Sequence, residues 1–278
     1  LTLLRVLVPF EGFKRVIRRW LAALAESWIG VNSVVIGALA RIRWDVALPE
    51  DVSPANSYVI CCNHQSWVDI LVLQKIFNRR APFMRFFIKQ QLIWVPFLGL
   101  AWWALDFPFM RRYSKQQLVK NPELRGRDLE SARVACEKFR DMPVSMMNFM
   151  EGTRFTPAKH AKQKSPYRNL LKPRIGGLGQ VLYSLNDQLR GMLDVTIVYP
   201  GGRPTFWEMA TGRIPEIIVR ARVVELPTDL LGVNFREDSE RREALESWTA
   251  GLFAEKDALI DDLLAGRDAA EPPGRAAA

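Results

Sequence analysis

Histidine and cysteine are scarce in this chain of 278 residues, which contains two histidines and three cysteines. Cys61 and Cys62 are adjacent while Cys136 is distant, and adjacent residues of a strand point to opposite faces of a sheet. An ordinary disulfide framework is therefore excluded, and the pattern indicates a reducing, cytoplasmic setting. A metal site that used Cys62 and His64 would lack a second pair of ligands at a suitable spacing, so we expect no bound metal.

Acidic residues are outnumbered by basic ones, 30 against 39, which gives a net charge of +9 and a pI near 9.7. This balance indicates a polyanionic partner or surface. The chain has no zinc-finger spacing, no aromatic-rich RNA-binding strand and no basic recognition helix, so we expect no nucleic acid as partner. Basic residues near the N-terminus instead flank apolar segments, at Lys14, Arg15, Arg18, Arg19, Arg41 and Arg43. Since each contributes about 1 kcal/mol near an anionic leaflet, we expect an anionic membrane surface as the partner.

The N-terminal 40 residues support this expectation. Leu1–Phe10 is almost wholly apolar and reads as the stub of a membrane helix, Glu11–Trp20 is basic, and Leu21–Ala40 is apolar apart from Glu26 and a few uncharged polar residues. The last segment has the length of a membrane span, but its polar residues favour a helix that lies in the interface or forms part of a short hairpin. The alternative is a buried helix of a soluble core. We expect residues 1–40 to be membrane-associated helices at the cytoplasmic face of the inner membrane.

The rest of the chain alternates between apolar runs typical of strands and periodic segments typical of helices. This order predicts an α/β fold, with a single domain over residues 41–265 in which helices flank a largely parallel central sheet. Residues 155–173 are polar and predict a loop, and residues 266–278 predict a disordered tail. We expect strands at 42–48, 57–62, 84–88, 144–149, 193–199 and 217–224, and helices at 67–77, 89–95, within 121–139, at 176–189 and at 236–264.

The segment from Asn63 to Asp69 lies between a predicted strand and a predicted helix, where functional residues often occur. It places a histidine, His64, five residues before a carboxylate, Asp69. A neutral imidazole there could take a proton from a substrate hydroxyl, while Asp69 fixes its tautomer and stabilises the imidazolium that forms. The alternative is structural, because Ser66 could be a helix N-cap with Asp69 as the third-position carboxylate of a capping box.

A second segment, Phe149–Phe155, also follows a predicted strand and contains Glu151, Gly152, Thr153 and Arg154. Its turn exposes backbone amides beside one guanidinium, and both kinds of donor can bind phosphate oxygens. This combination suits an anion. The alternative is a strand-end turn that carries a surface Glu–Arg pair.

Together the two segments resemble the glycerolipid acyltransferases, in particular the lysophosphatidic acid (1-acylglycerol-3-phosphate) acyltransferases, whose His-x-x-x-x-Asp motif precedes a Glu-Gly-Thr-Arg block. Between them, residues 89–99 resemble the family's Lys-x-x-Leu-x-x-x-Pro-x-x-Gly segment, and Arg112 falls where the family carries the Arg of its second block. The strand at 195–200 resembles a fourth, weaker block. The resemblance spans roughly residues 40–200 and implies that residues 41–265 are an acyltransferase domain.

Some positions depart from the family pattern. Asp106 and Arg111 stand where a Gly and an acidic residue are usual, Met150 replaces a Pro, and the strand proline of the fourth block comes only at Pro200. These changes resemble the branch that contains lysocardiolipin and lysophosphatidylinositol acyltransferases. They leave the chemistry intact and bear on the headgroup of the acceptor.

The resemblance implies transfer of a fatty acyl group from a thioester donor, acyl-coenzyme A or acyl-carrier protein, to the free hydroxyl of a lysophospholipid. His64 would be the general base, Asp69 would orient it, and no other cofactor is needed. The tetrahedral oxyanion would be bound by backbone amides near the start of the 67–77 helix or at Gly152. Lysophosphatidic acid is the first expected acceptor, and lysophosphatidylglycerol, lysophosphatidylinositol or a lysocardiolipin is the alternative.

By family position, the acceptor site contains Glu151, Gly152, Thr153 and Arg154, with Arg154 on the phosphate. Lys89 and Arg112 would add positive charge to the same anion, and the alternative for these two is charge that faces the membrane. A more distant alternative is a basic membrane-binding protein without catalytic activity, in which the motif residues are structural.

Overall fold

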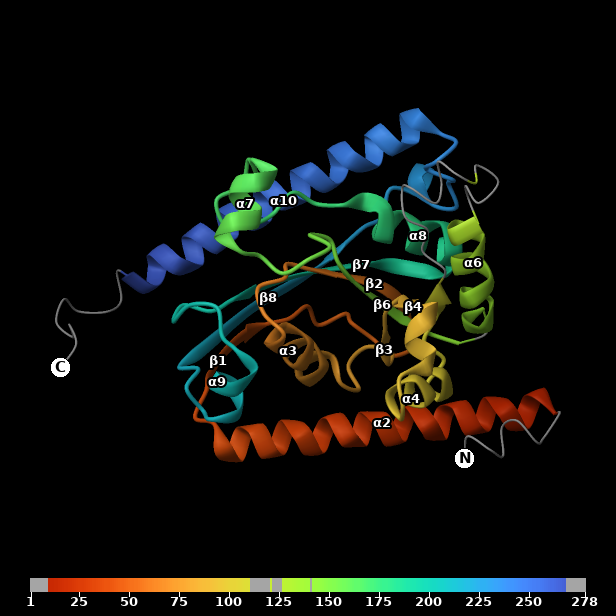
Figure 1. Cartoon of the computed structure of the whole chain (residues 1–278), viewed down its shortest axis with the longest axis horizontal. Coiled ribbons are helices and arrows are strands. Elements are labelled where there is room, and N and C mark those ends of the chain that lie inside the picture. Colours follow the sequence, from red (N-terminus) through yellow and green to blue (C-terminus); the bar gives the residue numbers. More distant parts are fainter. Residues whose placement is uncertain (1–9, 111–120, 122–126, 141, 269–278) are drawn as a thin grey trace.

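The computed structural model describes residues 10–110, 121, 127–140 and 142–268, and its centre is a six-stranded sheet (Figure 1). The strand order is β1-β8-β7-β2-β6-β3. The strands are β1 (Arg43–Ala47), β2 (Ser57–Cys62), β3 (Met84–Arg85), β6 (Ser145–Phe149), β7 (Leu189–Val198) and β8 (Glu216–Val224). A separate pair is formed by β4 (Ile88–Lys89) and β5 (Phe109–Met110).

The middle of the sheet is parallel. Strand β2 pairs in parallel with β6, where Cys62 lies opposite Phe149, and with β7, where Cys62 lies opposite Val195. Every residue of β2 is buried, as expected for a central strand covered on both faces. Strand β8 runs antiparallel to β7, and β1 runs parallel to β8. The predicted α/β fold with a largely parallel sheet flanked by helices is therefore confirmed.

Helices cover both faces of this sheet, and the alternating side chains of β2 point into two separate cores. On one face, Val59 and Cys61 pack with α6 (Arg127–Cys136), α8 (Ile175–Leu185) and α10 (Ser239–Asp268). On the other, Ile60 and Cys62 pack with α3 (Val68–Phe77) and with α9 (Phe206–Ala210). Figure 1 shows α10 along the top of the molecule and α2 along the bottom.

Helix α2 (Glu11–Leu39) is one uninterrupted helix of 29 residues. Its Gly12–Ala38 stretch is long and apolar enough to cross a membrane by length and composition, and only 6% of its apolar window is buried. Ile17 and Leu21 pack against α4 (Leu98–Ala104), but most other apolar side chains of α2 are exposed. Helix α2 is therefore not a buried helix of the core. The apolar Leu1–Phe10 segment lies outside the described residues except for Phe10.

Several predicted boundaries differ from the observed ones. The predicted strand 84–88 splits, because β3 pairs with β6 whereas β4 pairs with β5. The predicted helix 89–95 is instead a 3₁₀ helix, η1 (Gln90–Trp94). The predicted loop 155–173 contains α7 (Pro157–Gln163), which begins at a Thr156 side-chain cap followed by proline, a favourable start for a helix. Helix α10 continues to Asp268, three residues into the expected tail, and residues 269–278 lie outside the described part.

Candidate active site

Three loops that follow β2, β6 and β7 meet at one edge of the sheet. These three strands are neighbours and run in the same direction, so their carboxyl ends lie side by side. The loops after β2 and β6 carry the two segments singled out in the sequence, which are 87 residues apart at His64 and Glu151. Crevices at the carboxyl ends of parallel strands are where α/β proteins place their ligands.

His64 and Asp69 contact each other directly. His64 Nδ1 lies 2.9 Å from Asp69 Oδ2, and their side chains are 12% and 0% exposed. A carboxylate only accepts hydrogen bonds, so Nδ1 carries the proton and Nε2 keeps its lone pair. Nε2 has no partner among the described residues, which leaves the basic nitrogen available to a ligand.

Asp69 also holds the start of α3. Its Oδ2 accepts the backbone N–H of Gln65 at 2.7 Å and of Ser66 at 2.9 Å. The Ser66 hydroxyl accepts the N–H of Val68, although the N-cap position itself is occupied by Trp67. Asp69 therefore orients the histidine and also binds the backbone that leads into α3, but the capping box with Ser66 as N-cap is not formed, because Trp67 is the N-cap and no side chain caps the helix.

Tyr199 supplies the remaining contact of Asp69, and the sequence did not single it out. The Tyr199 hydroxyl donates to Asp69 Oδ1 over 2.6 Å, and both side chains are buried. Burial, with Asp69 alongside, holds the pKa of Tyr199 well above its usual value, so the hydroxyl remains a donor. Asp69 thus accepts hydrogen bonds on both oxygens, which fixes its orientation toward His64.

The loop after β6 holds the backbone of His64 at both ends. The His64 N–H donates to Glu151 Oε1 over 2.7 Å, and the His64 carbonyl accepts the N–H of Phe155 over 2.8 Å. The imidazole also stacks on the Phe149 ring, with centroids 3.8 Å apart and planes within 8°. These contacts leave little freedom for the ring to turn away from Asp69.

Glu151 lies beneath this site and is fully buried. Its second oxygen, Oε2, accepts the N–H of Leu171 over 2.9 Å, so both oxygens are engaged by backbone groups. Burial raises the pKa of Glu151 to about 7, against the opposing effect of these two hydrogen bonds. Among the described residues, Glu151 therefore contacts the polypeptide that carries the site, and its carboxylate does not reach the surface where a ligand would bind.

The next three residues form the turn above Glu151. Gly152 has a φ of 68°, which favours glycine, and a side chain there would meet Arg174 Cδ at 3.0 Å. The N–H of Gly152 donates to the Phe149 carbonyl, so this amide is already engaged. The Thr153 hydroxyl accepts from Lys159 Nζ at 2.8 Å, and the same ammonium donates to the carbonyl of the next residue at 2.9 Å.

Arg154 is exposed, and its guanidinium lies 4.7 Å from the centre of the Trp67 ring. Its N–H groups have no hydrogen-bonding or ion-pair partner in the part of the chain that the structure describes. Contact with the aromatic face limits the conformations of the side chain and leaves its planar donors available. This geometry is suited to an anion.

Of the two remaining basic residues, Lys89 and Arg112, the structure describes only Lys89. Lys89 is exposed at the end of β4, and its ammonium has no partner among the described residues. No hydrogen bond or ion pair joins it to the His64 or Arg154 loops. Arg112 lies outside the described residues, so its position stays a prediction.

Two further residues of the site region were not among the predicted site residues, although Asn63 lies in the first motif segment. Asn63 is buried and uses its side chain to donate to the carbonyl of Ile197 and to accept the N–H of the same residue, at 2.9 and 2.8 Å. Arg203, in the loop after β7, donates from Nε to Gln65 Oε1 over 2.6 Å. Neither contact has a local sequence signal, because each joins segments more than 130 residues apart.

The described residues contain no group of three or more His, Cys, Asp or Glu side chains that could hold a metal ion. Cys61, Cys62 and Cys136 are buried free thiols. Burial raises the pKa of the Cys136 thiol to about 12.

The sequence is similar to those of known acyltransferases. Residues 43–199, which include both motif segments, match the model of the Acyltransferase family. The chain is 22% identical over 260 residues to a probable 1-acyl-sn-glycerol-3-phosphate acyltransferase 5 of Arabidopsis thaliana, covering 88% of this chain and 63% of that protein. It is 24% identical over 247 residues to a 2-acyl-1-lysophosphatidylinositol acyltransferase of Saccharomyces cerevisiae, covering 74% and 61%.

The chain therefore spans about three fifths of the length of these relatives. Among solved structures, a similar chain is the 1-acyl-sn-glycerophosphate acyltransferase PlsC of Thermotoga maritima, with 16% identity, a TM-score of 0.43, and coverage of 91% of this chain and 87% of that one. Because the family match extends over more than half of the chain and includes the His64 and Glu151 loops, the protein belongs to the Acyltransferase family.

Proposed function

We propose that this protein transfers a fatty acyl group from an acyl thioester to the free hydroxyl of a lysophospholipid, with lysophosphatidic acid as the first acceptor and phosphatidic acid as the product. One observation carries the proposal: His64 Nε2 has no partner among the described residues, while its Nδ1 is held 2.9 Å from the buried Asp69. An alcohol is a poor nucleophile at neutral pH and needs such a base. Membership of the Acyltransferase family supports the same reaction class.

In the proposed reaction, His64 Nε2 takes the proton of the acceptor hydroxyl as its oxygen attacks the thioester carbonyl. Asp69 stabilises the imidazolium that forms. The tetrahedral intermediate then collapses, the bond from carbon to sulfur breaks, and the departing thiolate takes the proton from His64. The acceptor attacks directly, and the buried positions of Cys61 and Cys62 are consistent with a route that needs no acyl-cysteine intermediate.

For the oxyanion, the number of available donors near the site is small. The backbone N–H groups of Gln65, Ser66 and Val68 at the start of α3 already donate to side chains, and that of Gly152 donates to a carbonyl. We infer that the intermediate is stabilised by other donors of these loops, or by the charge of nearby arginine side chains.

Arg154 is the proposed ligand of the acceptor phosphate, since its free planar donors match phosphate oxygens in a bidentate manner. Glu151 supports the site from below, as a positioning residue for His64. The relatives include a lysophosphatidylinositol acyltransferase as well as 1-acyl-sn-glycerol-3-phosphate acyltransferases. Lysophosphatidylinositol, lysophosphatidylglycerol and lysocardiolipin are accordingly the alternative acceptors.

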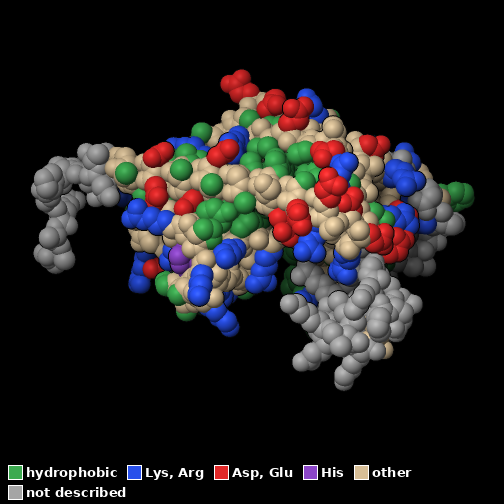
Figure 2. Space-filling view, turned by 90° about the horizontal axis from the view of Figure 1, so that it is seen from above, with side chains coloured by type: hydrophobic (Ala, Val, Ile, Leu, Met, Phe, Trp, Pro, Cys, Tyr) green, Lys and Arg blue, Asp and Glu red, His purple; other side chains and the backbone are tan. Residues whose placement is uncertain are grey.

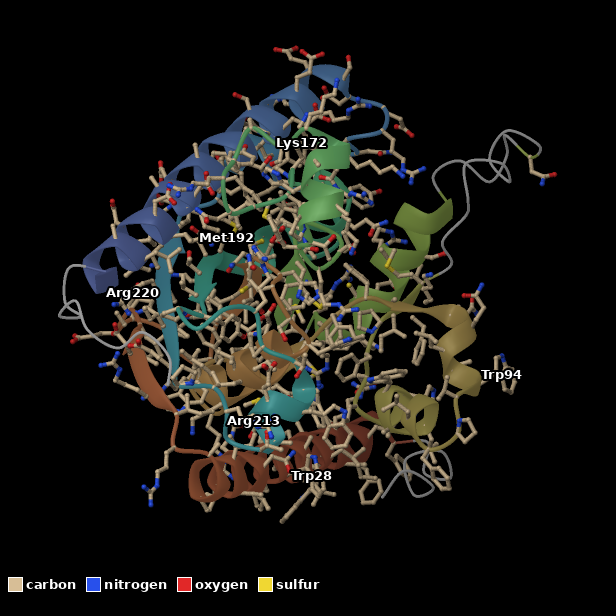
Figure 3. All side chains as sticks on the ribbon, turned by 60° about the vertical axis from the view of Figure 1, so that its left-hand side comes forward. Trp28, Trp94, Lys172, Met192, Arg213 and Arg220 are labelled. Carbon is tan, nitrogen blue, oxygen red and sulfur yellow. The ribbon has the colours of Figure 1, made fainter. Side chains whose placement is uncertain are left out.

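The proposed enzyme works at a membrane, which its α2 helix contacts. Exposed apolar side chains follow α2 at helical spacing, at Phe13, Val16, Trp20, Leu24, Trp28, Val31 and Val35. Near α4, Trp94 and Phe97 are 86% and 91% exposed. Figure 3 shows Trp28 and Trp94 projecting outward from the ribbon. Tryptophan favours the lipid–water boundary, so these side chains are suited to the surface of a bilayer.

The proposal is tested by thiol release from oleoyl-coenzyme A in the presence of lysophosphatidic acid, with the full chain in detergent. We expect acceptor-dependent release, and a fall in kcat of about 100-fold or more for His64→Ala because the base is lost. The matched control is His160→Gln, at the only other histidine, whose ring bonds the Tyr167 carbonyl and which we expect to remain active.

The outcomes separate the alternatives. Release with another lysophospholipid but not with lysophosphatidic acid would keep the chemistry and change the acceptor. Full activity of His64→Ala would remove His64 from the role of base. Absence of thiol release with every lysophospholipid tested, from both acyl-coenzyme A and acyl-carrier protein, would favour a membrane-binding protein without catalytic activity.

A further inference from the structure

Arg203 lies in a loop that is fastened to the His64 segment, although it belongs to none of the four sequence blocks. Tyr199 donates to Asp69, the Ser66 hydroxyl donates to the carbonyl of Pro204, and Arg203 Nε donates to Gln65 Oε1. These contacts hold the loop after β7 against the loop after β2. They fix Arg203 within the set of residues that surrounds the proposed base.

The guanidinium of Arg203 is held by two contacts that leave its outer edge available. Its carbon lies 4.0 Å from the centre of the Phe155 ring, and the Phe155 N–H is bonded to the His64 carbonyl. The Nε bond to Gln65 fixes the rotation of the planar group. Neither terminal nitrogen has a hydrogen-bonding or ion-pair partner among the described residues, so a fork of donors is preorganised and unused.

The charge on this group is not neutralised by a direct ion pair within the described part of the chain. Partial desolvation lowers the pKa of Arg203, and the buried Glu151 opposes this effect. A guanidinium stays charged throughout the physiological range. A cation that is partly removed from water and has free donors gains by binding an anion.

Arg154 and Arg203 have similar surroundings, because each guanidinium lies on an aromatic ring of a neighbouring loop. Arg154, after β6, lies on the ring of Trp67 in the loop after β2, and Arg203, after β7, lies on the ring of Phe155 in the loop after β6. On the His64 segment, Arg154 contacts Trp67 and Arg203 contacts Gln65, and a single residue separates these two positions. Two arginines with donors that are free among the described residues therefore contact the same short segment.

The proposed reaction brings phosphate groups from two molecules to this place. The acceptor carries a phosphate in its headgroup, and an acyl-coenzyme A donor carries a diphosphate and a ribose phosphate. We propose that Arg203 is a second phosphate-binding residue of the site, which binds a phosphate of one of the two substrates and contributes to substrate specificity. This inference rests on the proposed acyl transfer and extends it from one anion site to two.

The test compares Arg203→Gln with the wild-type chain by steady-state kinetics, varying each substrate in turn. Glutamine can still donate a hydrogen bond to Gln65 but has no charge. We expect KM for one substrate to rise by about 10-fold or more, as for loss of a charged hydrogen bond, with a much smaller change in kcat. Arg213→Gln is the matched control, since it removes an arginine charge beside α9 and α2, and we expect its KM values to match those of the wild-type chain (Figure 3).

The two KM measurements identify which substrate supplies the phosphate that Arg203 binds. A higher KM for oleoyl-coenzyme A assigns Arg203 to the donor, and a higher KM for lysophosphatidic acid assigns it to the acceptor. If both KM values stay unchanged while kcat falls, Arg203 only positions Gln65 and the proposal is wrong.

A binding measurement separates this proposal from the proposed activity. Calorimetric titration of the wild-type chain and of Arg203→Gln uses free coenzyme A in one series and glycerol 3-phosphate in the other, neither of which requires turnover. Weaker binding of one probe to the variant, with an unchanged thermal unfolding temperature, supports a phosphate site even if no lysophospholipid is acylated. Equal binding of both probes by the two proteins would overturn it.

Discussion

Asp69 shows how one carboxylate can serve both the fold and the chemistry. It orients His64 through Nδ1, accepts two backbone N–H groups at the start of α3, and receives the Tyr199 hydroxyl on its other oxygen. A substitution at Asp69 would therefore disturb the helix start as well as the proposed base, so loss of activity in such a variant would not isolate the catalytic role. Removal of the imidazole at His64 is the cleaner test.

Glu151 makes the stability of the protein depend on pH. Burial raises its pKa from 4.5 to about 7, which means that the folded state prefers the protonated carboxyl. The resulting stabilisation is complete below the unfolded pKa and is lost as the pH rises through 7. The loss amounts to on the order of 3 kcal/mol for a shift of this size. Glu151→Gln does not titrate, so we expect the wild-type chain to lose stability relative to this variant between pH 5 and 8.

Thermal or urea unfolding of both proteins across this pH range measures the difference. The relevant quantity is the change with pH of the difference between wild type and variant, because glutamine also replaces one of the acceptor oxygens that bind the His64 and Leu171 N–H groups. Parallel stability profiles would show that the carboxyl of Glu151 has an ordinary pKa in the folded protein.

At the scale of single elements, helix α10 is attached to the sheet by a buried charge. Lys256 is 2% exposed, and its ammonium lies 2.7 Å from Asp194 Oδ1 and 2.7 Å from the carbonyl of Val195 on β7. Removing one partner of a buried pair leaves the other charge without compensation and typically costs about 3–5 kcal/mol. Arg222 also contacts Asp194, at 3.2 Å, so we expect Lys256→Met to lose about 3 kcal/mol, near the lower end of that range.

Urea unfolding of Lys256→Met measures this loss. The double variant Lys256→Met/Asp194→Asn supplies the control, because it removes the uncompensated carboxylate and should be more stable than the single variant. An exposed ion pair typically contributes less than about 1 kcal/mol. A loss of this small size in Lys256→Met would mean that Arg222 alone compensates the Asp194 charge.

The long elements could be predicted because their signals are local. Strand β2 is a continuous apolar run, and α8 and α10 show helical spacing over many residues. The apolar run around Phe86 predicted a single strand, yet it divides between two sheets. Its division depends on partners that are distant in the sequence, since Arg85 is buried with its Nε bonded to the Leu105 carbonyl. The short helices α4 and α9 were missed because a few residues carry too little periodicity.

The residues of the candidate site also divide into those that could be predicted from local sequence and those that could not. His64, Asp69 and Arg154 could be named from the sequence because each motif is contiguous and follows a strand. Tyr199 and Arg203 could not, because their partners are defined only when β7 lies beside β2. The burial of Glu151 could not be predicted either, because it depends on a hydrogen bond from the backbone N–H of Leu171 to the Glu151 carboxylate.

At the scale of the whole molecule, α2 and α10 lie along opposite edges and differ in the side chains that they expose. Figure 1 shows α2 and α10 along opposite edges, and Figure 2, viewed from the α10 side, shows acidic and basic side chains interspersed over that surface. Helix α2 instead exposes a stripe of large apolar residues, next to basic side chains such as Arg15 and Arg19. The active-site loops lie between these edges, with Trp67 and Trp207 exposed at 59% and 74%. A bilayer against α2 would leave α10, on the opposite edge of the molecule, uncovered (Figure 1).

This orientation predicts which side chains bind membranes. We expect the triple variant Trp20→Ala/Trp28→Ala/Phe97→Ala to bind phosphatidylglycerol vesicles at least about 10-fold more weakly in a sedimentation assay, because each exposed ring would bury apolar area worth about 1.5 kcal/mol or more in the interface. Val134→Ala is the control, since Val134 is 52% exposed on α6, away from α2. Salt should weaken the binding of all these proteins, because the basic residues of α2 contribute through a screened field. Equal vesicle binding by the triple variant and the control would place the membrane contact elsewhere on the molecule.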